Sequence, residues 1–136
     1  MADAERPLTV LVVDDEPLIR WAIARTLTSA GYCVIEAPDG TSAIQALAQR
    51  PAPDMVLLDY RLPDFFGLSL LAWIRRMSPH TAVVMMSADL TPEMVNKATE
   101  LGAYRVMPKP FDMSDIEPVL RNAHSREVSS DGRLAS

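Results

Sequence analysis

The sequence has a single cysteine, Cys33, in 136 residues, which excludes an internal disulfide. We expect Cys33 to be a small apolar side chain on a buried strand, and a reducing, cytoplasmic setting is the simplest interpretation of such sparing cysteine use. The five glycines are scattered, so there is no glycine-rich loop of the kind that cradles phosphates. The two histidines, His80 and His124, lie far apart in the sequence and are interpreted as surface residues.

Basic residues are too few for a nucleic-acid-binding surface. Lysine and arginine number 13 against 18 aspartate and glutamate, for a net charge of -5, which argues against direct nucleic-acid binding. No apolar run approaches the roughly 20 residues that a membrane-spanning helix needs. The first residues contain Asp3 and Glu5 where a secretion signal would have an apolar segment. The overall composition is that of one globular domain.

Five short apolar runs alternate with five amphipathic stretches along the chain. The runs are rich in β-branched residues, as strands covered on both faces are, and they predict strands at 8–13, 32–37, 54–59, 81–86 and 104–107. The other stretches have helical periodicity and predict helices at 16–30, from 39 to the prolines at 51 and 53, at 65–77, at 91–101 and at 112–123. Asp15 and Thr91 are expected to cap two of these helices, and Asp39 opens another.

This alternation predicts an α/β domain with one parallel sheet, and right-handed crossovers place helices on both of its faces. The domain is expected to span residues 8–123. Residues 1–7 are predicted to be disordered, and the polar residues 124–136 are predicted to form a flexible tail or linker because they lack an apolar period. That tail is too short for a further domain, so the chain is expected to be a stand-alone protein or the amino-terminal part of a longer one.

Polar side chains follow the predicted strands at the points where the strands end. Asp14 and Asp15 follow the first strand, Asp59 ends the third, Ser87 follows the fourth and Lys109 follows the fifth. The carboxyl ends of parallel strands share one edge of an open sheet, where ligands bind. We therefore expect these five side chains to converge on one pocket.

The chemistry of that pocket follows from its charges. Two carboxylates about 4 Å apart repel by about 4 kcal/mol at an effective dielectric of about 20, so the site must take up a proton or a cation. Oxygen ligands without thiolate or imidazole favour a hard divalent ion, and few protein ligands favour Mg²⁺. A cation, an ammonium and a hydroxyl around a carboxylate suit a phosphoryl group, which the carboxylate could accept as an acyl phosphate. Taken singly, the same residues are ordinary helix caps, turn residues and solvated charges.

Several motifs resemble the receiver domain of bacterial two-component response regulators. The resemblance covers roughly residues 8–123, and the segment 107–112 is most similar to the nitrogen-regulation subgroup. The matching stretches are VVDDE at 12–16, LLD at 57–59 with Leu62, Pro63 and Gly67, MSA at 86–88, LGA at 101–103 and MPKPFD at 107–112.

The resemblance implies a flavodoxin-like (βα)5 three-layer sandwich with strand order 2-1-3-4-5. It implies that Asp59 accepts a phosphoryl group from a histidine kinase or phosphotransfer protein. It also implies further roles for residues around Asp59. The implied Mg²⁺ ligands are Asp14, Asp15, Asp59 and the backbone carbonyl of Arg61; the implied phosphate-binding groups are Ser87, the backbone N–H of Ala88, and Lys109; and the bond before Pro110 is expected to be cis.

The sequence departs from the family pattern at two places. The family usually has an aromatic residue three positions before the lysine, and here that position is Val106. Tyr104 lies two residues earlier, and a two-residue step in a strand keeps the same face, so a partial substitution is one interpretation. Phe65 and Phe66 follow the acceptor in a loop, where they either fill the core or offer a docking spot.

The resulting prediction is a phosphorylation-dependent switch rather than a conventional enzyme. It would signal to an effector domain or protein through the surface formed by the helix at 91–101, the strand at 104–107 and the helix at 112–123, where homodimerisation is a further option. Arg61 and Asp89 are expected to pair across the pocket and slow water attack on the acyl phosphate. One alternative is a pseudo-receiver that binds without being phosphorylated. The other is an aspartyl-phosphate phosphatase, which usually has a second acid where this sequence has Arg61.

Overall fold

The computed structural model describes residues 6–135 and the side chains of residues 6–129. Its five strands form one parallel sheet in the order β2-β1-β3-β4-β5, which confirms the flavodoxin-like α/β prediction. The strands are β1 (Thr9–Val13), β2 (Cys33–Ala37), β3 (Met55–Asp59), β4 (Ala82–Ser87) and β5 (Arg105–Pro108). The helices are α2 (Pro17–Ser29), α3 (Gly40–Leu47), α4 (Gly67–Met77), α5 (Pro92–Glu100), the 3-10 turn η1 (Met113–Asp115) and α6 (Ile116–Ala135).

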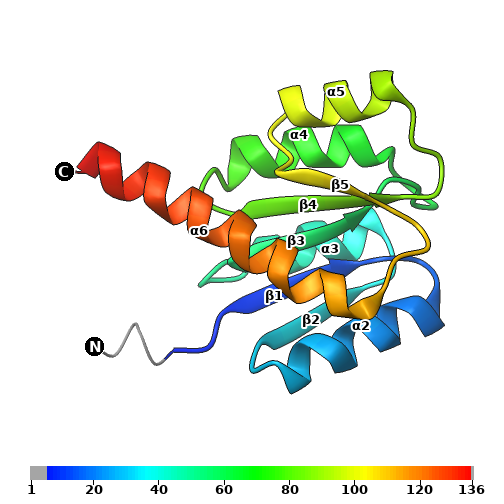
Figure 1. Cartoon of the computed structure of the whole chain (residues 1–136), viewed down its shortest axis with the longest axis horizontal. Helices are drawn as coiled ribbons and strands as arrows, with labels where there is room; N and C mark the ends of the chain where they lie inside the picture. Colours follow the sequence, from blue (N-terminus) through cyan, green and yellow to red (C-terminus); the bar gives the residue numbers. More distant parts are fainter. Residues whose placement is uncertain (1–5, 136) are drawn as a thin grey trace.

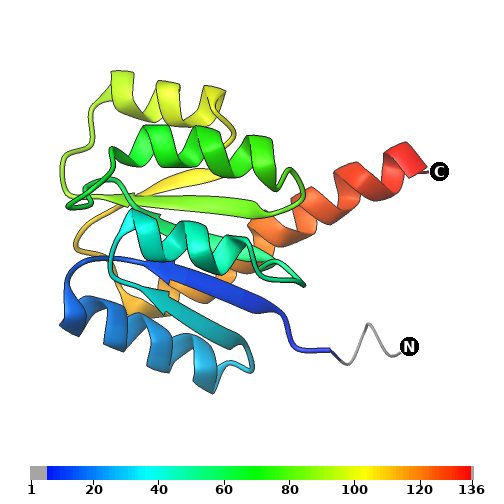
Figure 2. The same ribbon diagram turned by 180° about the vertical axis from the view of Figure 1, so that it is seen from behind.

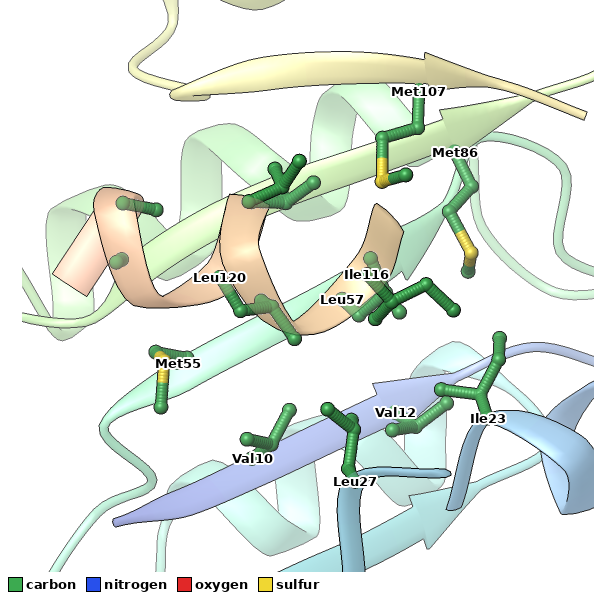
Figure 3. Packing of buried hydrophobic residues seen from close by; sticks show 14 residues of the cluster. Val10, Val12, Ile23, Leu27, Met55, Leu57, Met86, Met107, Ile116 and Leu120 are labelled. Carbon is green, nitrogen blue, oxygen red and sulfur yellow. The ribbon is translucent and has the colours of Figure 1, made fainter. Parts of the chain in front are cut away.

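The sheet is the middle of three layers. Helices α2 and α6 cover one face, and α3, α4 and α5 cover the other (Figures 1 and 2). Alternate residues of β1 point to opposite layers: Val10 and Val12 pack toward α2 and α6 (Figure 3), whereas Leu11 and Val13 pack toward the other helices. Helices shield both faces of the sheet from water, which explains why the sequences of the central strands are unbroken apolar runs.

The edge strand β2 differs from this pattern. Within residues 6–135 it pairs only with β1, and most of its residues are at least partly exposed, Cys33 among them. The prediction that Cys33 is buried is therefore wrong. An apolar run of five residues has the same appearance in a central and in an edge strand, and only the strand order tells the two apart.

Helix starts follow the predicted capping residues in two of three cases. Asp39 and Thr91 each accept a hydrogen bond from a backbone N–H in the first turn of the following helix, at 2.8 and 3.1 Å. The predicted cap at Asp15 is wrong. The N-cap of α2 is Glu16, whose side chain makes no capping bond, and Asp14 Oδ1 instead accepts from the Glu16 N–H at 2.9 Å. That contact uses one of the site's carboxylates to start the helix.

The last helix is longer than predicted. It begins at Ile116 after a 3-10 turn and continues to Ala135, projecting beyond the sheet (Figure 1), so residues 124–135 are helical rather than an irregular tail. No proline or glycine interrupts 124–131, and the ion pair of Glu127 with Arg75 on α4, at 3.1 Å, ties the extension to the domain. For residues 1–5 the prediction of disorder lies outside the described residues. Within 6–135 no helix is both long and apolar enough to cross a membrane.

Candidate functional site at the carboxyl edge of the sheet

The strand ends bring three charged side chains into direct contact. Lys109, just after β5, places its Nζ 2.8 Å from Asp14 Oδ2 and 3.0 Å from Asp59 Oδ2. Asp14 follows β1 and Asp59 ends β3, so residues up to 95 positions apart meet at one edge. The predicted convergence of these three side chains is confirmed. The Lys109–Pro110 peptide bond is cis, as the resemblance implied.

Three carboxylates form a cluster that suits a divalent cation. Asp14, Asp15 and Asp59 each offer one oxygen atom, and these oxygens lie within 4.8 Å of one another. Asp14 is fully buried and Asp59 is 5% exposed, whereas Asp15 faces solvent. The donor atoms are all hard oxygens and one carboxylate faces solvent, an arrangement that fits a Mg²⁺ ion that keeps several waters.

The buried charges at this edge are not fully balanced. Burial raises the pKa of Asp59 from 3.8 to about 6; the hydrogen bond from Lys109 opposes this rise, and the charge of Asp14 adds to it. Burial alone would lower the pKa of Lys109, but its hydrogen bonds to the two carboxylates outweigh that effect and raise the pKa above the usual value. One ammonium thus faces two carboxylates, and a second cation would relieve the remaining repulsion.

A cleft of about 350 Å³ opens beside Asp59. The cleft is lined by residues at the carboxyl ends of β1, β3, β4 and β5. The loop after β3 contributes a hydrophobic wall. The lining residues are Asp15, Glu16, Asp59, Arg61, Leu62, Pro63, Ala88 and Lys109. Within the described residues the Ala88 N–H has no hydrogen-bond acceptor, so it remains a donor for an anion in this cleft.

Ser87 is not among the residues that line this cleft. It ends β4, is buried, and accepts a hydrogen bond from the Asp89 N–H at its Oγ, at 3.1 Å. Its carbonyl oxygen accepts from the Lys109 N–H at 2.8 Å. In the sheet register Asp59 pairs with Met86, so Ser87 stands one residue beyond the position opposite Asp59 on the neighbouring strand.

Arg61 and Asp89 pair at the surface, as predicted. Arg61 Nη2 lies 2.6 Å from Asp89 Oδ2, and both side chains are largely exposed. The backbone N–H of Arg61 also donates to Asp59 Oδ1 at 3.2 Å. It therefore helps to hold one oxygen of the Asp59 carboxylate in place. The pair connects the loops after β3 and β4, which flank the cleft.

The interpretation of Tyr104 as a substitute aromatic is wrong. Val106 packs against the cluster under α3, α4 and α5, whereas Tyr104 packs against the opposite cluster under α2 and α6. Tyr104 precedes the first residue of β5, so strand alternation does not extend to it. Its ring lies 5.9 Å from the guanidinium carbon of Arg126 on α6 and lines a separate cleft of about 310 Å³, which the three site aspartates do not line.

The loop after β3 is anchored by Asp64, a role that no sequence motif indicated. Asp64 accepts hydrogen bonds from the N–H groups of Gly40, at 2.8 Å, and Thr41, at 3.0 Å, and so caps α3 from a distance. The ring of Phe65 closes over Gly40 and is partly exposed. Phe66 is 82% exposed, so the core interpretation of this residue is wrong.

Two further contacts at the site had no sequence signal of their own. Glu16 Oε1 lies 3.4 Å from Lys109 Nζ, and Arg20 donates to the backbone carbonyl of Asp14 at 2.7 Å. Both residues lie at or near the start of α2, where charged residues are ordinary surface features. Only the position of that helix relative to the sheet reveals these contacts.

The fold and this edge define a class of protein: a flavodoxin-like α/β domain with an acidic, lysine-containing cleft at the carboxyl ends of its strands. The match to known families makes the class specific. Residues 10–121 match the response regulator receiver domain, and the chain belongs to that family.

Similar proteins agree with this assignment. The chain is 35% identical over 116 residues to the DNA-binding transcriptional regulator NtrC of Escherichia coli K12, covering 85% of this chain and 24% of that protein. It is 36% identical over 128 residues to the transcriptional regulatory protein PdtaR of Mycobacterium tuberculosis, covering 92% of this chain and 60% of that protein. The solved receiver domain of NtrX from Brucella abortus superposes with a TM-score of 0.79 at 36% identity, covering 85% of this chain and 98% of that one. The chain thus spans only part of the length of NtrC and PdtaR.

Proposed function

We propose that the chain is a phosphorylation-dependent signalling switch in the cytoplasm, with Asp59 as the residue that accepts the phosphoryl group. The phosphodonor would be a histidine kinase or a phosphotransfer protein. The observation that carries the proposal is the contact of Lys109 with both Asp14 and Asp59 beside an open cleft. Membership of the receiver family supports it.

The transfer uses an Asp59 carboxylate oxygen as nucleophile. An oxygen–phosphorus bond forms, the phosphorus–nitrogen bond to the donor histidine breaks, and the electron pair of that bond returns to the imidazole ring. Lys109 already stands 3.0 Å from Asp59 and pairs with the incoming negative charge. The Ala88 N–H and the Ser87 hydroxyl are the nearby donors for phosphoryl oxygens.

The acidic cluster would hold Mg²⁺ through Asp14, Asp15, Asp59 and the backbone carbonyl of Arg61. The ion supplies positive charge against the phosphoryl oxygens when it is bound. The chain's activity would be limited to its own phosphotransfer and dephosphorylation, with no separate substrate turned over.

The switch would report through the surface formed by α5, β5 and α6, to an effector domain or protein or to a second copy of the chain. Phosphorylation adds a charge of about -1.5 to -2. Moving a population from about 1% to about 99% active takes about 5.5 kcal/mol of preference for the active state. The Ser87–Lys109 main-chain bond joins the ends of β4 and β5, so contacts made at the phosphoryl group reach this surface directly.

The test is incubation with acetyl phosphate and Mg²⁺, followed by intact mass measurement. The native chain should gain the mass of one phosphoryl group, and the Asp59→Asn variant should gain none. Equal gain in both proteins, or gain in neither, would overturn the proposal. Failure of the native chain to bind both Mg²⁺ and beryllofluoride would indicate a pseudo-receiver instead.

A further inference from the structure

Arg20 joins the acidic site to the edge strand through two charge-assisted hydrogen bonds. On one side its Nη1 donates to the backbone carbonyl of Asp14 at 2.7 Å. On the other its Nε donates to Glu36 Oε1 at 3.0 Å, near the carboxyl end of β2. The Arg20 side chain is only 17% exposed, so packing as well as hydrogen bonding limits its orientation.

The carbonyl that Arg20 holds lies just beyond the end of a strand. β1 ends at Val13, and the Asp14 N–H still bonds to the Ala37 carbonyl at 3.1 Å. The Asp14 carbonyl lies beyond the last inter-strand hydrogen bond of β1. Arg20 supplies the donor that a neighbouring strand would otherwise provide. It therefore determines the orientation of the peptide between Asp14 and Asp15.

Asp15 depends on that peptide more than the other carboxylates do. Asp14 and Asp59 are both fixed by Lys109, and each accepts a backbone N–H bond as well. Within the described residues the Asp15 side chain makes no hydrogen bond or ion pair, although its oxygen completes the three-carboxylate cluster. No side-chain contact within the described residues holds it there, so its place in the cluster depends on its backbone.

We propose that Arg20, oriented by Glu36, is a positioning residue for the divalent-cation site, acting through the Asp14 carbonyl to hold Asp15 beside the other two carboxylates. This inference rests on the proposed function, since it requires that the cluster binds Mg²⁺. Arg20 bonds to the Asp14 backbone carbonyl and to Glu36, not to a carboxylate oxygen of the cluster. Its effect comes from the preorganisation of ligands, as it does for other residues that orient metal ligands.

The sign of the effect separates positioning from simple electrostatics. Arg20 is a positive charge near the cation site, so charge alone predicts that its neutralisation tightens Mg²⁺ binding. Positioning predicts that Mg²⁺ binds more weakly, because an Asp15 carboxylate that is free to move must be ordered when the ion binds. The two explanations therefore differ in direction.

The experiment is calorimetric titration with Mg²⁺ alone, at a temperature where each variant is shown to be folded. Arg20→Met should weaken Mg²⁺ binding about tenfold, the lower end of what loss of a ligand-orienting group costs. Arg20→Lys should also bind more weakly than the native chain, although it keeps the charge, because an ammonium does not reproduce the two-pronged geometry of a guanidinium. Arg25→Met is the matched control: Arg25 lies on the same helix, is exposed and stacks on Trp21, and its loss should leave Mg²⁺ binding unchanged.

Native or tighter Mg²⁺ binding by Arg20→Met overturns the inference, and a lowered denaturation midpoint with native Mg²⁺ affinity assigns Arg20 a structural role only. If Arg20→Met does not fold, Glu36→Gln provides the test, since it leaves Arg20 in place without its anchor. That variant should weaken binding about threefold, a smaller loss than for a deleted orienting group, and native affinity there overturns the inference as well. Absence of Mg²⁺ binding by the native chain would instead overturn the proposed function.

Discussion

Replacing Asp59 by asparagine should stabilise the folded chain at neutral pH when no divalent cation is present. The Asp59 side chain is buried, and its pKa rises from 3.8 to about 6 because of burial and the charge of Asp14, despite the opposing bond from Lys109. As the pH rises through this interval, the unfolded chain loses the proton first. Ionisation of Asp59 therefore lowers the free energy of unfolding between about pH 4 and pH 6, and the penalty is complete above that range.

The magnitude follows from the shift. About two pH units correspond to at most about 3 kcal/mol, and water in the open cleft screens the charge, so we expect a gain of about 1–2 kcal/mol above pH 6. Asparagine has nearly the same shape, and its amide oxygen can still accept from Lys109. The gain should vanish near pH 4, where the native Asp59 is protonated.

Urea denaturation of both proteins in EDTA, from about pH 4 to pH 8, measures this difference. Added Mg²⁺ should stabilise the native chain more than Asp59→Asn and so reduce the gap. Asp15→Asn is a control at an exposed position of the same cluster and should have a smaller effect in EDTA. A variant that is less stable than the native chain at neutral pH, or a gap that does not change with pH, would refute the reasoning.

Three other changes test separate parts of the structure. Lys109→Met removes an ammonium that lies 2.8 and 3.0 Å from two carboxylates, so Mg²⁺ should bind about tenfold more tightly, equivalent to about 1.4 kcal/mol in a calorimetric titration; unchanged affinity would contradict this. The exposed pair should add less than about 1 kcal/mol to stability, so Arg61→Gln with Asp89→Asn should leave urea denaturation nearly unchanged. The same double variant should speed loss of the acyl phosphate up to about fivefold, and an unchanged rate would discard the shielding role. Gly67→Ala would place a Cβ 2.5 Å from the Tyr60 carbonyl oxygen and should cost about 1–3 kcal/mol in urea denaturation, whereas native stability would show that the loop yields easily.

The fold could be predicted because its determinants are local and repeated. Alternation of apolar runs and helical stripes specifies a parallel sheet, and the topology then brings the strand ends together. The contact between Lys109 and Asp14 spans 95 positions, yet it follows from their places after two parallel strands. No pairing information beyond the strand order was needed for this part of the site.

Features that depend on the distance to neighbouring elements could not be predicted. Cys33 is exposed because β2 is an edge strand, and Phe66 points outward although it is as apolar as a core residue. The extension of α6 is stabilised by Glu127 and Arg75, which are 52 positions apart and carry no motif. In each case the sequence specifies the residue type, and the environment follows from packing between distant segments.

Position 106 in β5 is valine rather than an aromatic residue, and Tyr104 packs against the cluster on the other face of the sheet. If Asp59 is the acceptor as proposed, the main chain around Ser87 would connect it to the surface formed by α5, β5 and α6. Its Oγ accepts from the Asp89 N–H and its carbonyl accepts from the Lys109 N–H. A hydroxyl can donate to a phosphoryl oxygen while it still accepts from an N–H. A shift of Ser87 toward Asp59 would therefore carry the loop that leads to α5 and the end of β5 with it, and this coupling requires no side chain at position 106.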